Sequence, residues 1–169
     1  LSPNQTVDER KFAFDAKLDE LIASLPDPEL VGELNRTRSI LGALIDLEWD
    51  DSLYSHLDAE GRYNNTFLAL IALVKAESLR RPLIMFVDDI HFIHLDTLAF
   101  LSQLKRSLSA ASATYPVAVI LGYRNQGVEL KISGDLLDLL LRHPYCQAGR
   151  VPKGNRRAVW HHRGCYHLL

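Results

Sequence analysis

The most constraining feature of this sequence is an apolar run that ends in two acids. Leu83–Val87 is uniformly apolar and leads directly into Asp88 and Asp89. A continuous apolar run of strand length is typical of a strand buried on both faces of a sheet. Adjacent carboxylates at the end of such a strand repel each other and resist desolvation. A role in binding a metal ion or a reacting water would explain why both acids are present at this position.

A second apolar run follows at 117–124, with the sequence "VAVILGYR". Between the two runs, Asp96 and Thr97 can cap a helix with leucines at helical spacing, and "SAASATYP" breaks that helix. A strand, a helix and a strand in this order indicate a parallel sheet with a crossover helix. We therefore expect Leu83–Val87 and Val117–Gly122 to be adjacent parallel strands.

The N-terminal half has helical periodicity. Apolar residues recur at helical spacing over 8–25, from Pro28 to 47 and over 65–80, while 48–65 has no sustained period and is expected to be a loop. Glycines at 32 and 42 are expected to weaken the second helix, and a further short helix is expected at 133–143. The fold class is therefore α/β, with a helix-rich N-terminal half and a parallel sheet with flanking helices.

The stretch "RPLIMFVDDIHFIHLDTLAFL" at 81–101 resembles the Walker B strand and following helix of the STAND branch of the AAA+ P-loop ATPases. These are the origin-recognition-like ATPase modules of large bacterial signalling regulators. The residues that match the family pattern are Pro82, Leu83–Val87, Asp88, Asp89, Ile90, His91 and Phe92. His94 departs from it, because the family usually has Asp there. The resemblance covers about residues 34–125 and implies part of a P-loop NTPase-type sheet.

The expected site lies at the strand ends, where open parallel sheets collect their functional groups. Asp88 is the expected Mg²⁺ ligand, acting through water, and Asp89 is the expected catalytic residue that orients or deprotonates an attacking water. Arg124 ends a run that resembles the family's sensor strand, so we expect it to contact the terminal phosphate of ATP. The structural alternative is that the aspartates bind the N-terminus of the next helix and pair with Arg124.

The phosphate-binding loop of the family is missing, because no G-x-x-x-x-G-K-[ST] occurs in the sequence. In the family this loop lies upstream of the Walker B strand, so it is expected before Leu1. We therefore interpret residues 1–145 as an N-terminally truncated AAA+/STAND ATPase domain. The parent protein would bind and hydrolyse ATP with Mg²⁺ in signal transduction, and the isolated chain would be inactive.

Two alternatives stay open. The first is a non-catalytic regulatory or interaction module on the same α/β scaffold, which gains if the natural protein starts at Leu1. The second is a DExH-type helicase fragment, because "DDIH" at 88–91 resembles the DExH box and "SAT" occurs at 112–114. In such helicases the tripeptide follows the next strand, whereas here it precedes the run at 117–122.

The C-terminal segment 146–169 differs in composition, with five Lys or Arg and no Asp or Glu after Gly149. Cys146, His161, His162 and Cys165 match no familiar zinc spacing, so we interpret this segment as a basic tail, either disordered or an aberrant end.

A net charge of −2 does not indicate a nucleic-acid-binding protein. Two cysteines form no disulfide framework, and the apolar run at 67–74 is too short to span a membrane. We expect a cytoplasmic chain whose partners are nucleotide, other domains of the same polypeptide or a second copy.

Overall fold

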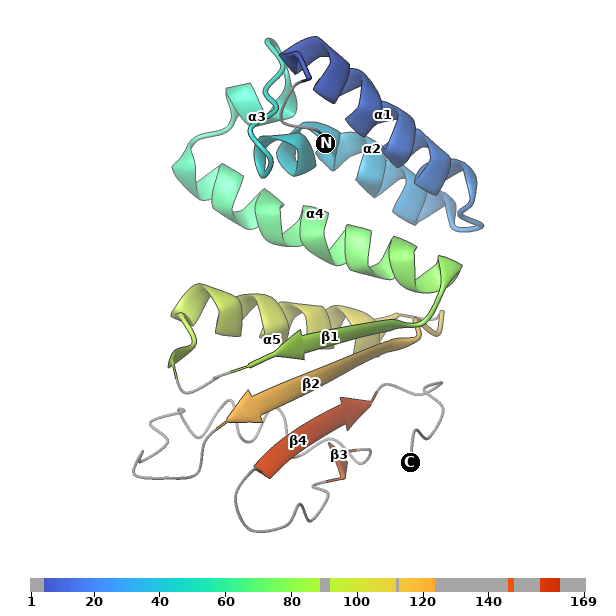
Figure 1. Cartoon of the computed structure of the whole chain (residues 1–169), viewed down its shortest axis with the longest axis vertical. Coiled ribbons are helices and arrows are strands. Elements are labelled where there is room, and N and C mark those ends of the chain that lie inside the picture. Colours follow the sequence, from blue (N-terminus) through green and yellow to red (C-terminus); the bar gives the residue numbers. More distant parts are fainter. Residues whose placement is uncertain (1–4, 89–91, 112, 124–145, 148–155, 162–169) are drawn as a thin grey trace. The chain divides into compact units, whose positions relative to one another are not determined.

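The structure is a computed structural model that describes residues 5–88, 92–111, 113–123, 146–147 and 156–161. The chain forms two compact units, Leu1–Arg80 and Arg81–Leu169. The first is helical and the second contains the sheet (Figure 1). This α/β architecture, with a parallel strand pair and a helix-rich N-terminal half, agrees with the sequence prediction. The described helices are all too short or too polar to cross a membrane.

The helical unit consists of α1 (Val7–Ala23), α2 (Pro28–Ala43), α3 (Leu53–His56) and α4 (Ala59–Arg80). α1 begins with a capping box, in which Thr6 accepts from the Glu9 amide and Glu9 accepts from the Thr6 amide. At the start of α2 the Asp27 carboxylate accepts from two backbone amides, and Pro28 occupies the first turn. The first two helices predicted from periodicity are confirmed, with ends within a few residues of those expected.

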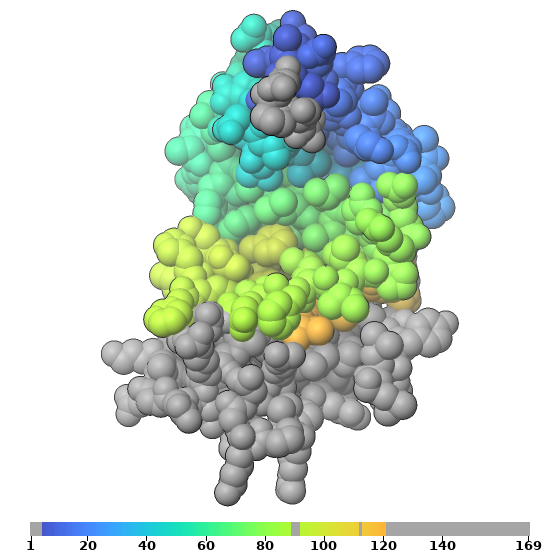
Figure 2. Space-filling view, in the orientation of Figure 1, coloured from blue at the N-terminus to red at the C-terminus, as the bar shows by residue number. Residues whose placement is uncertain are grey.

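The core of the helical unit is built from one apolar face of each long helix. Its fully or nearly fully buried apolar side chains include Leu18, Leu21, Leu30, Leu34, Ile40, Leu41, Leu47, Phe67 and Ile71. Figure 2 shows the outer surface of these helices, coloured from blue to green along the sequence. Buried Thr37 donates its hydroxyl hydrogen to the Glu33 carbonyl at 2.7 Å, so this polar group is hydrogen-bonded inside the core.

The predicted loop at 48–65 was wrong over much of its length. α3 lies within it, and α4 begins at Ala59 rather than near Asn65. Local hydrogen bonds from side chains explain the longer helix. The side-chain amide of Asn65 donates to the Gly61 carbonyl, and the Asp58 carboxylate accepts from the backbone amide of Gly61. These polar residues satisfy the backbone at the start of α4, so the helix forms there without an apolar period.

In the second unit β1 (Leu83–Val87) and β2 (Val117–Tyr123) are parallel neighbours, in a register from Leu83 opposite Val117 to Val87 opposite Leu121. α5 (Leu95–Ala110) connects them and carries three buried leucines at positions 101, 104 and 108. The predicted strand pair and crossover helix are therefore confirmed. A proline marks the start of each strand in the sequence, since Pro82 precedes β1 and Pro116 precedes β2.

The sheet continues beyond this pair, in the order β1-β2-β4-β3. β3 (Cys146–Gln147) and β4 (Arg156–His161) are antiparallel to each other, and β4 is antiparallel to β2. The rest of 146–169 and the expected helix at 133–143 lie outside the described residues, so the domain boundary at 145 and the basic tail stay predictions.

Burial along β1 differs from the expectation of a strand buried on both faces. Leu83, Met85 and Val87 are partly buried, but Ile84 and Phe86 are 55% and 54% exposed. Because successive side chains of a strand point to opposite faces, the alternation shows that one face of β1 is covered and the other is open to solvent.

Candidate functional site

Asp88 lies where the sequence predicted it, immediately after the C-terminal end of β1. Its neighbour Val87 pairs with Leu121, and β2 ends two residues later at Tyr123. The carboxyl ends of the two strands are therefore adjacent, as in sheets that collect functional groups at this edge. Asp88 is exposed to solvent.

The other two predicted site residues, Asp89 and Arg124, lie outside the described residues. The structure thus places one member of the predicted Asp88, Asp89 and Arg124 site and leaves the geometry of the set as a prediction. An exposed carboxylate beside a strand end suits a cation held largely through water. Within the described ranges, no cluster of three or more Asp, Glu, His or Cys could hold a metal ion by itself.

The helix after the aspartates begins differently from the prediction. The N-cap of α5 is His94, whose imidazole Nδ1 lies 3.4 Å from the backbone amide of Asp96 and 3.0 Å from its carboxylate. Asp96 is in the first turn of α5, where a carboxylate interacts favourably with the helix dipole. The predicted cap at Asp96 and Thr97 was therefore two residues too late, because histidine can also supply the capping acceptor.

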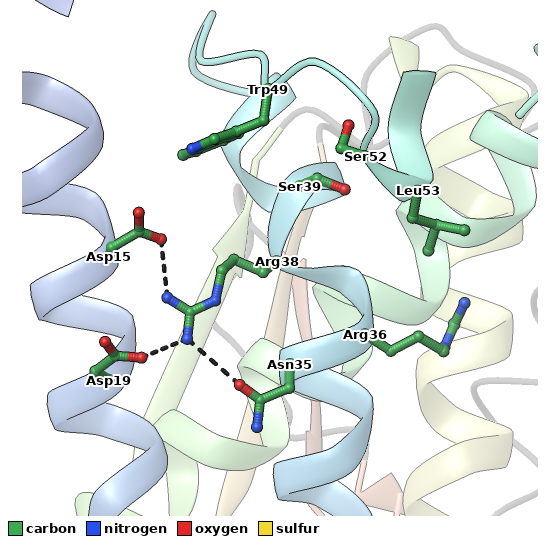
Figure 3. Close-up of a pocket in the computed structure, with 9 residues that line it drawn as sticks. All are labelled: Asp15, Asp19, Asn35, Arg36, Arg38, Ser39, Trp49, Ser52 and Leu53. Carbon is green, nitrogen blue, oxygen red and sulfur yellow. Dashed lines mark hydrogen bonds and ion pairs between the residues drawn. The ribbon is translucent and has the colours of Figure 1, made fainter. Parts of the chain in front are cut away.

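The helical unit contains a separate polar pocket of about 470 Å³ that sequence reasoning missed. Side chains from α1, α2 and the segment leading into α3 form its walls (Figure 3). The lining residues are Asp15, Asp19, Asn35, Arg36, Arg38, Ser39, Trp49, Ser52 and Leu53. A signal for it existed in the sequence, since Asp15 and Asp19 are one helical turn apart and can share one cation.

Arg38 is the centre of this pocket. Its guanidinium donates to Asp15 Oδ1 at 2.8 Å and to the Asp19 carboxylate, so one side chain of α2 joins two carboxylates of α1 (Figure 3). Burial opposes the charged form of Arg38, but the hydrogen bonds that its guanidinium donates to Asp19 and Asp15 outweigh this effect and raise its pKa. The arginine therefore stays charged and fixes α1 against α2.

The second arginine of the pocket is engaged elsewhere. Arg36 binds both carboxylate oxygens of Glu33, at 2.6 and 2.9 Å, and also donates to Asn65 Oδ1 at 2.7 Å. In Figure 3 its side chain points away from Arg38. Both arginines form ion pairs with carboxylates of the protein, so the main role of the pocket is a polar contact between helices.

An aromatic side chain completes the pocket. The Trp49 ring lies 5.8 Å from the Phe14 ring, and the Lys11 ammonium lies 5.4 Å from the centroid of the indole. Both partners are on α1, so the indole adds an apolar and cation–π contact beside the Arg38 ion pairs. α1 is thus held by charge and by ring contacts at the same place.

Comparison with known proteins adds nothing to these observations. No family model, no curated protein sequence and no solved structure matches the chain. The features of this chain that bear on its function are therefore the motif at 81–101 and the position of Asp88.

Proposed function

We propose that this chain supplies the Walker B and sensor side of the nucleotide site in a STAND-type signalling ATPase with a P-loop NTPase fold. The observation that supports the proposal most is the parallel pairing of β1 and β2. This pairing brings Asp88 to the edge of the sheet where β2 also ends. The last residue of β2 is Tyr123, which directly precedes Arg124 in the sequence. Antiparallel pairing would have put the ends of these strands at opposite edges of the sheet.

The proposed roles follow from the chemistry of the three side chains. Asp88 would hold Mg²⁺ through water, and Asp89 would orient or deprotonate an attacking water. Arg124 would bind the terminal phosphate, since a guanidinium donates paired hydrogen bonds to phosphate oxygens. ATP with Mg²⁺ supplies the phosphoanhydride that is hydrolysed. Asp89 and Arg124 enter this proposal from the sequence, and Asp88 from sequence and structure.

The chain by itself should bind ATP·Mg²⁺ weakly, because its sequence has no G-x-x-x-x-G-K-[ST] loop to surround the phosphates with backbone amides. Isothermal titration calorimetry with residues 1–169 measures this directly. Tight binding of ATP by this chain would contradict the proposed division of the site.

The decisive experiment uses a longer polypeptide that joins this chain to a phosphate-binding loop. Asp88→Asn should weaken Mg²⁺-dependent ATP binding and turnover together, whereas Asp89→Asn should abolish turnover and leave ATP bound. Arg124→Ala should slow turnover and reduce discrimination between ATP and ADP. Asp50→Asn, at an exposed position of the helical unit, removes the same charge and should change neither quantity. Unchanged hydrolysis in the three site variants would show that the aspartates are structural.

A second candidate, a non-catalytic interaction module, is favoured by one observation. Ile84 and Phe86 are more than half exposed on a strand whose composition is that of a buried one. Apolar side chains on a sheet edge are typical of surfaces that bind another chain. The variants above separate the two candidates, since an interaction module requires no change in hydrolysis.

A further inference from the structure

The polar pocket of the helical unit has room for a small molecule. Its volume of about 470 Å³ is within the roughly 300–1,000 Å³ that small-ligand sites occupy. Arg38 extends from α2 toward its two carboxylates on α1, whereas Arg36 extends to the opposite side of α2 (Figure 3). The ion pairs that join the helices therefore form the sides of the pocket and leave space between them.

Asn35 and Ser39 form the base of this space. They are one turn apart on α2, so their side chains lie on the same face of the helix. Ser39 Oγ accepts from the Tyr54 backbone amide at 3.2 Å, and its hydroxyl can also donate. One side-chain N–H of Asn35 donates to the Val31 carbonyl at 3.0 Å, and the other can donate to a ligand. The base of the pocket thus offers both donors and acceptors.

The charged residues at the sides select an uncharged ligand. Asp15 and Asp19 each use Oδ1 to bind Arg38, and a carboxylate can accept further hydrogen bonds through its second oxygen. The charges of these two aspartates balance those of Arg36 and Arg38 among the lining residues. An anion would compete with the carboxylates for the arginines, and a cation would compete with the arginines for the carboxylates. A neutral molecule with donors and acceptors can bind without breaking an ion pair.

Trp49 and Leu53 add apolar surface to the same pocket. The contacts of the indole with Phe14 and Lys11 leave it partly exposed, and it lies above Ser39 in the view of Figure 3. A ligand that fits this lining has polar groups on one part of its surface and carbon-bound hydrogens on another.

We propose that this pocket binds a neutral monosaccharide. Each sugar hydroxyl both donates and accepts, so it matches the mixed polar groups at the base and sides of the pocket. The carbon-bound hydrogens of the sugar ring pack against Trp49. All the lining residues belong to the helical unit, so the inference does not depend on the proposed ATPase function.

The first test is an NMR titration of the full chain with D-glucose, D-galactose and D-mannose. At least one of these sugars should bind with a Kd of about 1–10 mM, which is typical of so small a ligand. The indole N–H of Trp49 and the side-chain NH₂ of Asn35 should shift saturably. The indole N–H of Trp160, on β4 of the other unit, is the internal control and should not shift. No saturable shift at the two pocket resonances with any of the sugars up to about 100 mM would overturn the proposal.

The second test removes polar groups from the base of the pocket. Asn35→Ala should weaken sugar binding at least fivefold, because it removes a donor and an acceptor from an exposed helix position. Asn64→Ala is the matched control, since it makes the same change at an exposed position of α4 outside the pocket. An affinity that Asn35→Ala leaves unchanged would contradict the assigned site.

The third test examines charge in the unmodified chain, so it does not depend on how a variant folds. The sugar that binds best is compared with its 6-phosphate and with its 2-amino-2-deoxy derivative, whose amine is protonated at neutral pH. Both charged derivatives should bind at least threefold more weakly than the neutral sugar, because each has to compete with an existing ion pair. Equal or tighter binding of the phosphate would indicate an anion site, and equal or tighter binding of the amino sugar a cation site. Either result would refute the inference.

Discussion

Gly42 in α2 lies against the indole ring of Trp49, and this contact makes a quantitative prediction possible. A Cβ atom added at Gly42 would lie 2.7 Å from Trp49 Cη2 and 3.1 Å from the Leu47 carbonyl oxygen, and Trp49 Cζ3 is closer still. The ring cannot move without losing its contacts with Phe14 and Lys11. Overpacking of this kind costs about 1–3 kcal/mol, against a gain of up to about 1 kcal/mol from replacing a helical glycine. Gly42→Ala should therefore lower the free energy of unfolding by about 1 kcal/mol.

The same helix offers a matched control. Gly32 is exposed, and an added Cβ would meet nothing within 4 Å. Gly32→Ala should raise the free energy of unfolding by up to about 1 kcal/mol, so the two variants should differ by about 2 kcal/mol. Urea unfolding followed by Trp49 fluorescence in a Trp160→Phe background measures both. If Gly42→Ala stabilises the chain as much as Gly32→Ala does, Trp49 does not pack on Gly42 and the reasoning is wrong.

Further predictions concern the charges and caps of the helical unit. Arg38→Met removes the cation shared by two α1 carboxylates and should cost about 1 kcal/mol at low salt and less at high salt, measured by urea unfolding at both ionic strengths. Asp27→Ala removes the acceptor at the start of α2 and should cost about 1 kcal/mol, whereas Asp27→Asn should retain most of the stability. The backbone and side-chain hydrogen bonds from Thr6 hold the pKa of Glu9 below its ordinary value of 4.5. Since the folded pKa is the lower one, this stabilisation is present above the ordinary pKa and is lost as pH falls through the folded value. The protection factors of the amides in the first turn of α1, which are exchange rates corrected for the intrinsic effect of pH, should therefore fall at acid pH, and Glu9→Gln should remove that pH dependence.

The sheet could be predicted from sequence because its signals are local and strong. Leu83–Val87 and 117–122 are short apolar runs, and a leucine-bearing helical segment connects them. A helical crossover of that length is typical of parallel neighbours, so the pairing can be predicted once the elements are recognised. The position of Asp88 then follows from the chain itself, since it is the residue after β1.

The features that were missed depend on contacts between distant parts of the chain. Arg38 meets Asp15 and Asp19 across two helices, and neither helix shows this pairing in its own periodicity. Gly42 was expected to weaken α2, yet its missing side chain makes room for Trp49. In both cases the function of the residue is set by a partner that only the folded helical unit supplies.

The disagreement at β1 between composition and burial has a physical meaning. Five consecutive apolar residues are typical of a strand that is covered on both faces of its sheet. In β1 only one face is covered, because Leu83, Met85 and Val87 are partly buried whereas Ile84 and Phe86 are exposed. A further layer over the second face would remove both side chains from water, which is the condition that the composition of the strand indicates.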